Sequence, residues 1–85
     1  MIAIEQALKN VQKAFPNFKV VSSYEFRGKY VFDMIEKEKN EEPQGYTVEV
    51  IKDGDGKVLT PDMDEMFNHL DELEEAKKNM IIYKD

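Results

Sequence analysis

The chain has 85 residues and no cysteine, and 41% of its residues are hydrophobic while 35% are charged. This length accommodates one domain with one core, and the apolar content is typical of a folded chain. The formal net charge of -6, from 12 Lys plus Arg against 18 Asp plus Glu, disfavours direct binding of DNA or RNA. The lack of cysteine excludes disulfides and thiolate metal sites, and it favours a cytoplasmic location.

The N-terminal segment predicts an amphipathic helix. Apolar residues recur at spacings of three and four over residues 2–15, and Pro16 ends the pattern, because the residue before proline is disfavoured in helical geometry. Glu5 and Lys9 interrupt the apolar residues, so we do not expect a signal peptide here. No stretch of the sequence approaches the roughly 20 apolar residues of a membrane span, and we expect no contact with a membrane.

Period-two alternation of apolar and polar residues predicts three strands and a short fourth. They cover residues 18–26, 30–37, 46–51 and 57–59. Arg27-Gly28 is typical of the tight turn of a β-hairpin, and the glycine-rich residues 53–56 are typical of a second turn. The charged residues 38–45 have no apolar period and predict an exposed loop.

A second helix is predicted from Thr60 to about Lys78. Thr60 suits the N-cap and Pro61 the first helical position, and acidic residues follow where the helix dipole favours negative charge. The expected buried stripe consists of Met63, Met66, Phe67, Leu70 and Leu73. Residues 79–85 would form a flexible or docked tail, and its apolar part could be a last helical turn, a docked extension or an extra edge strand.

Together these elements predict a single α+β domain over residues 1–85, in the order α-β-β-β-(β)-α. We expect two layers, with an antiparallel meander of three to four strands and both helices packed on one of its faces. Under strict alternation the covered face carries Phe18, Val20, Tyr24, Phe26, Tyr30, Phe32, Met34, Tyr46, Val48 and Val50. The opposite face then carries Val21, Val31, Ile35 and Ile51.

Residues that commonly carry chemistry are few. His69 is the only histidine, and the only serines, Ser22 and Ser23, lie within a predicted strand, so we expect no nucleophile with an adjacent base. Residues 53–56 partly match an EF-hand calcium loop, but the ligand at its first position is lacking and Asp62 replaces its bidentate Glu. We therefore predict a turn there, no metal, no cofactor and no enzymatic activity.

Two surfaces are candidates for binding a partner. The outward side of the second helix is acidic, and it is either a solvated face or an imitation of nucleic-acid phosphates. Its candidate residues are Asp64, Asp71, Glu72 and Glu75. The apolar residues on the back of the sheet are covered by the tail, are merely scattered, or form a patch that binds a protein partner, including a second copy of the chain. Its candidate residues are Val21, Val31, Ile35 and Ile51.

Residues 15–26, together with Tyr30-Val31-Phe32, resemble small proteins encoded by phages and prophages of Gram-positive bacteria. The strand 46–50 with Gly56-Lys57-Val58 resembles a later hairpin of the same proteins, and it is also similar to the hairpin of PepSY-type domains. No activity is established for that phage family, so the resemblance implies no site residues in this chain. We expect a non-enzymatic phage or prophage accessory protein that binds another protein in the cytoplasm of the bacterial host. The alternative is an acidic nucleic-acid mimic that inhibits a host nuclease or defence complex, in the manner of an anti-CRISPR protein.

Overall fold

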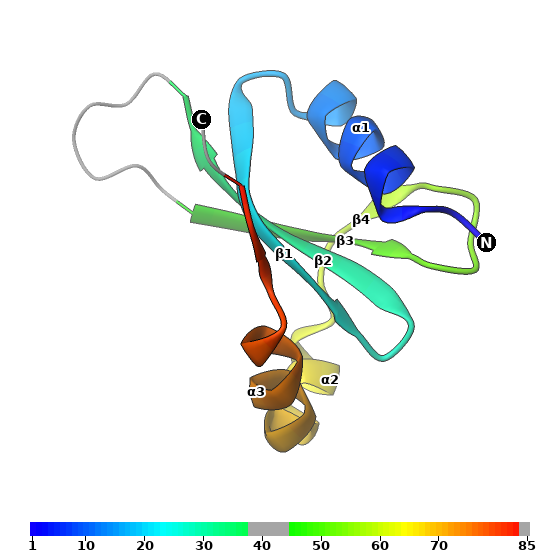
Figure 1. The fold of residues 1–85 in the computed structure, drawn as a ribbon, viewed down its shortest axis with the longest axis vertical. Helices are drawn as coiled ribbons and strands as arrows, with labels where there is room; N and C mark the ends of the chain where they lie inside the picture. The colour runs from blue at the N-terminus through cyan, green and yellow to red at the C-terminus, as the bar shows by residue number, and fades with distance from the viewer. Residues whose placement is uncertain (38–44, 84–85) are drawn as a thin grey trace.

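The computed structural model describes residues 1–37 and 45–83 and has the predicted α+β architecture (Figure 1). Within these residues five antiparallel strands form one sheet in the order β4-β3-β2-β1-β5, accompanied by three helices. The elements in chain order are α1 (Ile4–Ala14), β1 (Phe18–Phe26), β2 (Lys29–Glu36), β3 (Gly45–Ile51), β4 (Val58–Leu59), α2 (Met63–Asn68), α3 (Leu70–Lys78) and β5 (Ile81–Ile82). The predicted fold class is confirmed, including the N-terminal helix and the C-terminal helical segment.

A two-residue turn joins β1 to β2. Arg27 and Gly28 have φ angles of 49° and 78°, a left-handed pair whose twist matches that of the two strands it connects. Phe26 pairs with Lys29 across this turn. The predicted hairpin turn is therefore confirmed, and glycine at its second position avoids the strain that a side chain would add.

A bulge in β1 interrupts the alternation of the strand. Val20 pairs with Met34, whereas Ser22 pairs with Asp33, the next residue back along β2. Val21 is therefore an extra residue with no pairing partner of its own on β2. Every β1 residue after Val21 faces the side opposite to the one that a simple period of two assigns to it.

The bulge corrects the predicted orientation of Tyr24 and Phe26. Strict alternation places both under the same helices as Phe32, but Tyr24 pairs with Val31, a neighbour of Phe32 whose side chain points to the other side. Side chains directly opposite each other in an antiparallel pair share a face. Tyr24 and Phe26 therefore lie on the side of the sheet that carries Val31, and their predicted position was wrong.

The first face of the sheet is covered by α1 and holds the larger core. Ala7 and Val11 of α1 are fully buried against it. The strand residues beneath α1 are Val20, Tyr30, Phe32, Met34, Val48 and Val50. The Tyr30 hydroxyl donates to the backbone carbonyl of Ile2 at 2.9 Å, which holds the start of the chain beside this core.

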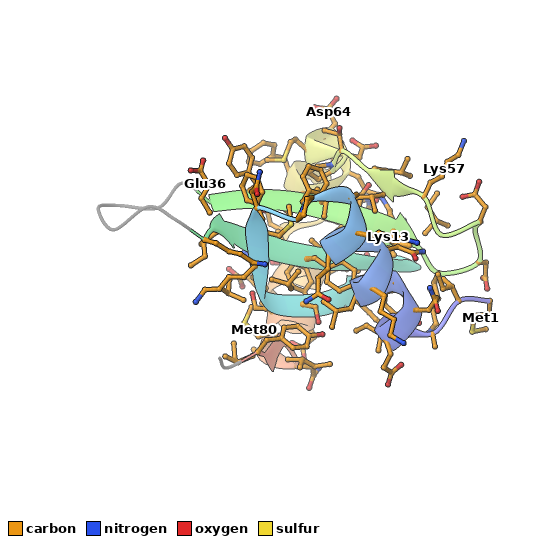
Figure 2. All side chains as sticks on the ribbon, turned by 90° about the horizontal axis from the view of Figure 1, so that it is seen from above. Met1, Lys13, Glu36, Lys57, Asp64 and Met80 are labelled. Atoms are coloured by element: carbon orange, nitrogen blue, oxygen red, sulfur yellow. The ribbon has the colours of Figure 1, made fainter. Side chains whose placement is uncertain are left out.

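The second face of the sheet is covered by α2 and α3, so the prediction that both helical segments share one face was wrong. Seen from above in Figure 2, α1 lies in front of the strands while α2 and α3 lie behind them. The buried residues here are Tyr24, Phe26, Val31 and Met66, with Leu73, Ala76 and Met80 packed against them. The physical cause is the bulge, because it turns two aromatic residues to this side and creates an apolar surface for the helices.

The C-terminal segment differs in detail from the single helix that the sequence predicts. The backbone leaves helical geometry at His69, which separates α2 from α3. The N-cap of α2 is Asp62 and not Thr60, and the Asp62 carboxylate accepts from the backbone N–H of Glu65 at 3.1 Å. After α3, β5 pairs antiparallel with residues 22–23 of β1, so the tail forms the extra edge strand. Residues 84–85 lie outside the described residues.

The remaining connections agree with the sequence where they are described. The turn at residues 53–56 is present, and the Gly56 carbonyl accepts from the Asn10 side-chain amide of α1 at 3.0 Å. Of the predicted loop 38–45, residues 38–44 lie outside the described residues and Gly45 begins β3. In the described part of the chain, every helix is too short or too polar to span a membrane.

Candidate functional site

Three apolar side chains line the outer side of α2 and α3. Met63, Phe67 and Leu70 are 51%, 64% and 52% exposed, although the sequence places all three in a buried stripe. Met63 and Phe67 lie four residues apart on one side of α2, and Leu70 begins α3 directly after the break at His69. We call Met63, Phe67 and Leu70 the α2–α3 face.

The residues that pack on the sheet lie in the same segment of the chain. They are Met66 of α2, Leu73 and Ala76 of α3 and Met80 just after α3, and they contact the cluster of Tyr24, Phe26 and Val31. Because the backbone leaves helical geometry at His69, spacing along the sequence does not by itself separate them from the α2–α3 face.

Exposed strand residues lie on the same side of the sheet as α2 and α3. Ile51 pairs with Lys29, and Leu59 pairs with Glu49, so both side chains point to the second face. Ile51 is 44% exposed and Leu59 is 37% exposed. The exposed apolar residues of this side are therefore not confined to the helices.

Acidic side chains flank the α2–α3 face. Asp64 and Asp71 directly follow Met63 and Leu70 in the chain, and both are exposed. No ion pair of either aspartate is present in the part of the chain that the structure describes. Of the predicted acidic site, these two carboxylates remain available to a partner.

The other two acidic candidates are engaged within the protein. Arg27 Nη1 donates to both carboxylate oxygens of Glu72, at 2.8 and 3.0 Å. Glu75 pairs with Lys78 at 3.2 Å, and because both side chains are 71% exposed, this pair contributes little to stability. The structure thus does not present the four predicted carboxylates as one free acidic surface.

The β1–β2 turn is tied to α2 and α3 by further ion pairs. Lys29 Nζ donates to the Glu65 carboxylate and, at 3.4 Å, to Glu49 of β3. Arg27 Nε lies 3.7 Å from a Glu65 oxygen. His69 Nδ1, between the two helices, lies 3.5 Å from Arg27 Nη1. The only histidine therefore sits at the edge of a structural ion-pair cluster.

Glu49 is the buried member of this cluster, with its side chain 5% exposed, and Lys29 beside it is half-buried, with its side chain 15% exposed. Burial alone would lower the pKa of Lys29, but the hydrogen bonds and charges of Glu65 and Glu49 outweigh it and raise that pKa above its ordinary value. Oε2 of Glu49 is buried without a hydrogen-bond partner among the described residues. Lys29 is thus the main neutralising charge for a carboxylate inside the second face.

A polar row crosses the second face beside this cluster. The hydroxyls of Ser22 and Thr47 donate to the Asp33 carboxylate at 3.2 and 2.8 Å, linking β1, β2 and β3. Burial raises the pKa of the nearby Tyr24 to about 12, and the negative charges of Asp33 and Glu49 add to this effect. The second face is therefore only partly apolar.

The predicted apolar patch on the back of the sheet is not assembled as an exposed surface. Val31 is completely buried in the cluster beneath α2 and α3. Val21 and Ile35 are half-buried, and Ile51 alone among the four is exposed. The helices cover Val31, at a place that the sequence left to the tail or to a partner.

The described residues contain no group of three or more His, Asp or Glu side chains placed to hold a metal ion. In the turn that partly matches a calcium loop, the Asp55 carboxylate accepts from the backbone N–H of Lys57 at 3.1 Å. This hydrogen bond stabilises the turn itself.

Comparisons of the chain with models of protein families, with curated proteins and with solved structures found no match.

Proposed function

We propose that the protein acts by binding another protein through the α2–α3 face, without catalysing a reaction. The observation that supports this best is that Met63, Phe67 and Leu70, on the consecutive helices α2 and α3, are each more than half exposed. Single exposed apolar residues are ordinary, but several large ones close together in two short consecutive helices are typical of an interaction surface. Flanking polar residues are also typical of such surfaces, since they form the rim around an apolar centre.

The charge around this face supports a basic partner. Asp64 and Asp71 flank the apolar residues, and the chain as a whole carries a formal net charge of -6. Two copies that met through this face would bring their aspartates together, so a second copy of the chain is disfavoured as the occupant. From the resemblance to small phage and prophage proteins, we further propose an accessory protein whose partner is in the cytoplasm of the bacterial host.

A second proposal is the acidic nucleic-acid mimic that inhibits a nuclease or defence complex. Its support is the exposure of Asp64 and Asp71. It is the weaker proposal because Glu65 and Glu72 are bound to Lys29 and Arg27 and interrupt the row of negative charges. A mimic needs a continuous row, since it substitutes for regularly spaced phosphates.

The test uses the double variant Met63→Ser with Phe67→Ser, and Ile82→Ser as the matched control. Ile82 is 59% exposed on β5, so the control removes a comparable exposed side chain from a different element. The wild type and the control should retain the same partner from a lysate of cells that carry the gene. With that partner purified, the double variant should bind at least about ten times more weakly, because central apolar residues dominate interface energies. Equal affinity of the double variant and the control would contradict the proposal.

Salt separates the two proposals. Between about 0.05 and 0.5 M salt, binding through the apolar face should weaken only a few-fold, because screening acts on charges. The mimic predicts a steep loss of affinity with salt and a comparable loss on Asp64→Lys with Asp71→Lys. If the charge reversals abolish the complex but the double variant Met63→Ser with Phe67→Ser still forms it, the result favours the mimic.

A further inference from the structure

The outer side of β5 is an open edge of the sheet. The strand order ends at β5, and Figure 2 shows this strand at one end of the sheet. The edge of β1 next to it is covered by the chain itself, because β5 pairs with residues 22–23 and the preceding Asn79 and Met80 continue beside Glu25 and Tyr24. On this side of the described chain, a further strand can therefore join at the outer edge of β5.

Ile82 directs its backbone N–H and C=O to this open edge. The N–H of Tyr83 donates to the carbonyl of Val21 at 2.9 Å, so Tyr83 faces β1. In an antiparallel pair, alternate residues direct both backbone groups toward the same neighbouring strand. Ile81 therefore also faces β1, and Ile82, which lies between them, faces outward. No strand of the described chain lies on that side to accept or donate a hydrogen bond.

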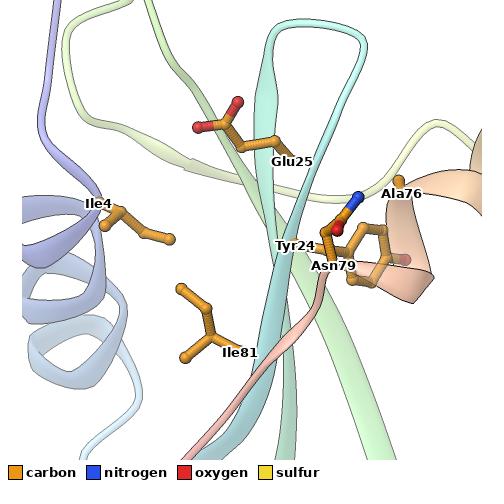
Figure 3. Close-up of a pocket in the computed structure, with 6 residues that line it drawn as sticks. All are labelled: Ile4, Tyr24, Glu25, Ala76, Asn79 and Ile81. Carbon is orange, nitrogen blue, oxygen red and sulfur yellow. The ribbon is translucent and has the colours of Figure 1, made fainter.

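The side chains of β5 are apolar and exposed on both faces of the sheet. Ile82 pairs with Ser22 and Ile81 pairs with Ser23, so the two isoleucines point to opposite faces. They are 59% and 46% exposed. Figure 3 shows Ile81 directed toward Ile4 of α1, and both residues line a cavity of about 360 Å³. The edge of β5 thus combines free backbone groups with apolar side chains.

The other edge of the sheet carries features that block strand addition, and β5 lacks them. Lys57 precedes β4, and Pro61 follows it two residues later. Charged residues and prolines at an edge are common means by which proteins prevent pairing between sheets. Residues 79–83 contain neither a charged residue nor a proline. The composition of this segment therefore favours pairing with another strand.

We propose that β5 pairs antiparallel with β5 of a second copy of the chain, about a twofold axis at Ile82. In this register the two copies of Ile82 exchange two backbone hydrogen bonds, and Ile81 of each copy lies opposite Tyr83 of the other. A second copy suits this edge because it carries the same free backbone groups, so that one symmetric contact satisfies both molecules. Over residues 81–83 the contact also brings no like charges together.

Sedimentation equilibrium of the wild type tests the association. At about 0.3 M salt, which screens the net charge of -6 on each copy, the protein should pass from monomer to dimer as its concentration rises. We expect dimers to be abundant by about 1 mM, because a contact of this size is weak. Over the same range the Ile82 amide proton should exchange more slowly with solvent, since it becomes hydrogen-bonded. A monomer at every concentration would overturn the proposal.

A pair of charged variants tests the register. Ile82→Lys should weaken self-association at least about ten-fold, because it removes an apolar contact and places like charges directly opposite each other. Ile82→Glu should do the same. An equimolar mixture of the two variants should associate more strongly than either alone, because this register brings residue 82 of one copy against residue 82 of the other. A mixture that associates no better than the separate variants would contradict this register.

The proposed surface is independent of the α2–α3 face. The matched control is the double variant Met63→Ser with Phe67→Ser, which should dimerise as the wild type does. Conversely, Ile82→Ser should weaken the dimer and leave binding through the α2–α3 face unchanged, so the two proposals can fail separately. Loss of the dimer in the Met63 and Phe67 variant, with normal dimerisation of Ile82→Lys, would assign self-association to the α2–α3 face and count against the proposal. The wild-type measurements decide the question if a variant does not fold, as judged by circular dichroism.

Discussion

The two faces of the sheet hold their helices by different means. Beneath α1, the first face carries six buried residues that are apolar or aromatic. On the second face, Tyr24, Phe26 and Val31 give α2 and α3 a small apolar contact, and ion pairs to Arg27 and Lys29 supply the rest. Burial of apolar area depends little on pH or salt, whereas ion pairs depend on both. The attachment of α2 and α3, which carry the proposed binding surface, therefore depends more on pH and salt than the attachment of α1 does.

The largest effect is expected from the first face. Phe32 is completely buried at its centre, and Phe32→Ala should lower the free energy of unfolding by about 3–5 kcal/mol, because it removes apolar contacts and leaves a cavity. Chemical denaturation measures this change. A loss below about 1 kcal/mol would mean that the first face is not the main core.

Removing the cation that pairs with the buried Glu49 carboxylate should have the next largest effect. Lys29→Met leaves the Glu49 carboxylate buried without its cation and should cost about 3 kcal/mol. Adding Glu49→Gln removes the unpaired charge, so the double variant should be more stable than Lys29→Met alone. If the two substitutions simply add their costs, Lys29 and Glu49 are not coupled.

Alkaline pH should destabilise the second face through Tyr24. Burial raises the pKa of Tyr24 to about 12 in the folded protein, whereas the unfolded chain loses this proton at the ordinary tyrosine value of 10.0. Stability that is present below pH 10 is therefore lost as the pH rises through this interval, by roughly 2–3 kcal/mol. The raised pKa of Lys29 acts in the same direction.

Tyr24→Phe removes the tyrosine part of this dependence and leaves the Lys29 part in place. Denaturation curves of the two proteins at several pH values between neutral and strongly alkaline would separate them. The wild type should lose stability more steeply than the variant over that range. Identical slopes would show that the Tyr24 hydroxyl titrates normally.

Removing the exposed ion pair between the β1–β2 turn and α3 should change the free energy of unfolding much less. Arg27 and Glu72 have side chains 36% and 54% exposed, and Arg27→Gln should cost under about 1 kcal/mol. The same substitution should reduce the salt dependence of stability, because it removes a screened interaction. A cost comparable to that of Lys29→Met would indicate that the turn, and not the buried pair, holds α2 and α3.

The smallest effect should come from the α2–α3 face itself. Phe67 is 64% exposed, so Phe67→Ser should change stability by no more than about 0.5 kcal/mol. Its neighbour Met66 is 7% exposed, and Met66→Ala should cost about 2 kcal/mol or more. Thermal unfolding of the two variants side by side checks the contrast. Similar losses would place Phe67 in the core and remove it as a binding residue.

Local patterns predict the elements well but not their placement. The hairpin at Arg27-Gly28 and the first helix follow from turn chemistry and from a spacing of three and four residues. The bulge at Val21 has no local sequence signature, because valine is common in regular strands. That one residue decides which side Tyr24 and Phe26 face, and with it where the C-terminal helices pack.

Only part of the candidate site could be predicted from the sequence, because the rest depends on contacts between distant parts of the chain. Exposure of Asp64 and Asp71 follows from their charge, which keeps such residues in water. Glu72 differs from them only in lying opposite Arg27, a contact between residues 45 positions apart. Such pairing depends on the tertiary structure and cannot be derived from the pattern within the helix.

The pairing of β5 with β1 has a consequence for the order of folding. The hydroxyls of Ser23 and Tyr83 lie 2.8 Å apart although they are separated by 60 positions in the chain. The β1–β2 hairpin closes over two residues, whereas β5 must find β1 after a long loop has closed, which costs more chain entropy. We therefore expect the last strand to join the sheet late in folding and to leave it early in unfolding. Opening at that end would loosen the attachment of α3 and expose the edge of β1 that β5 covers.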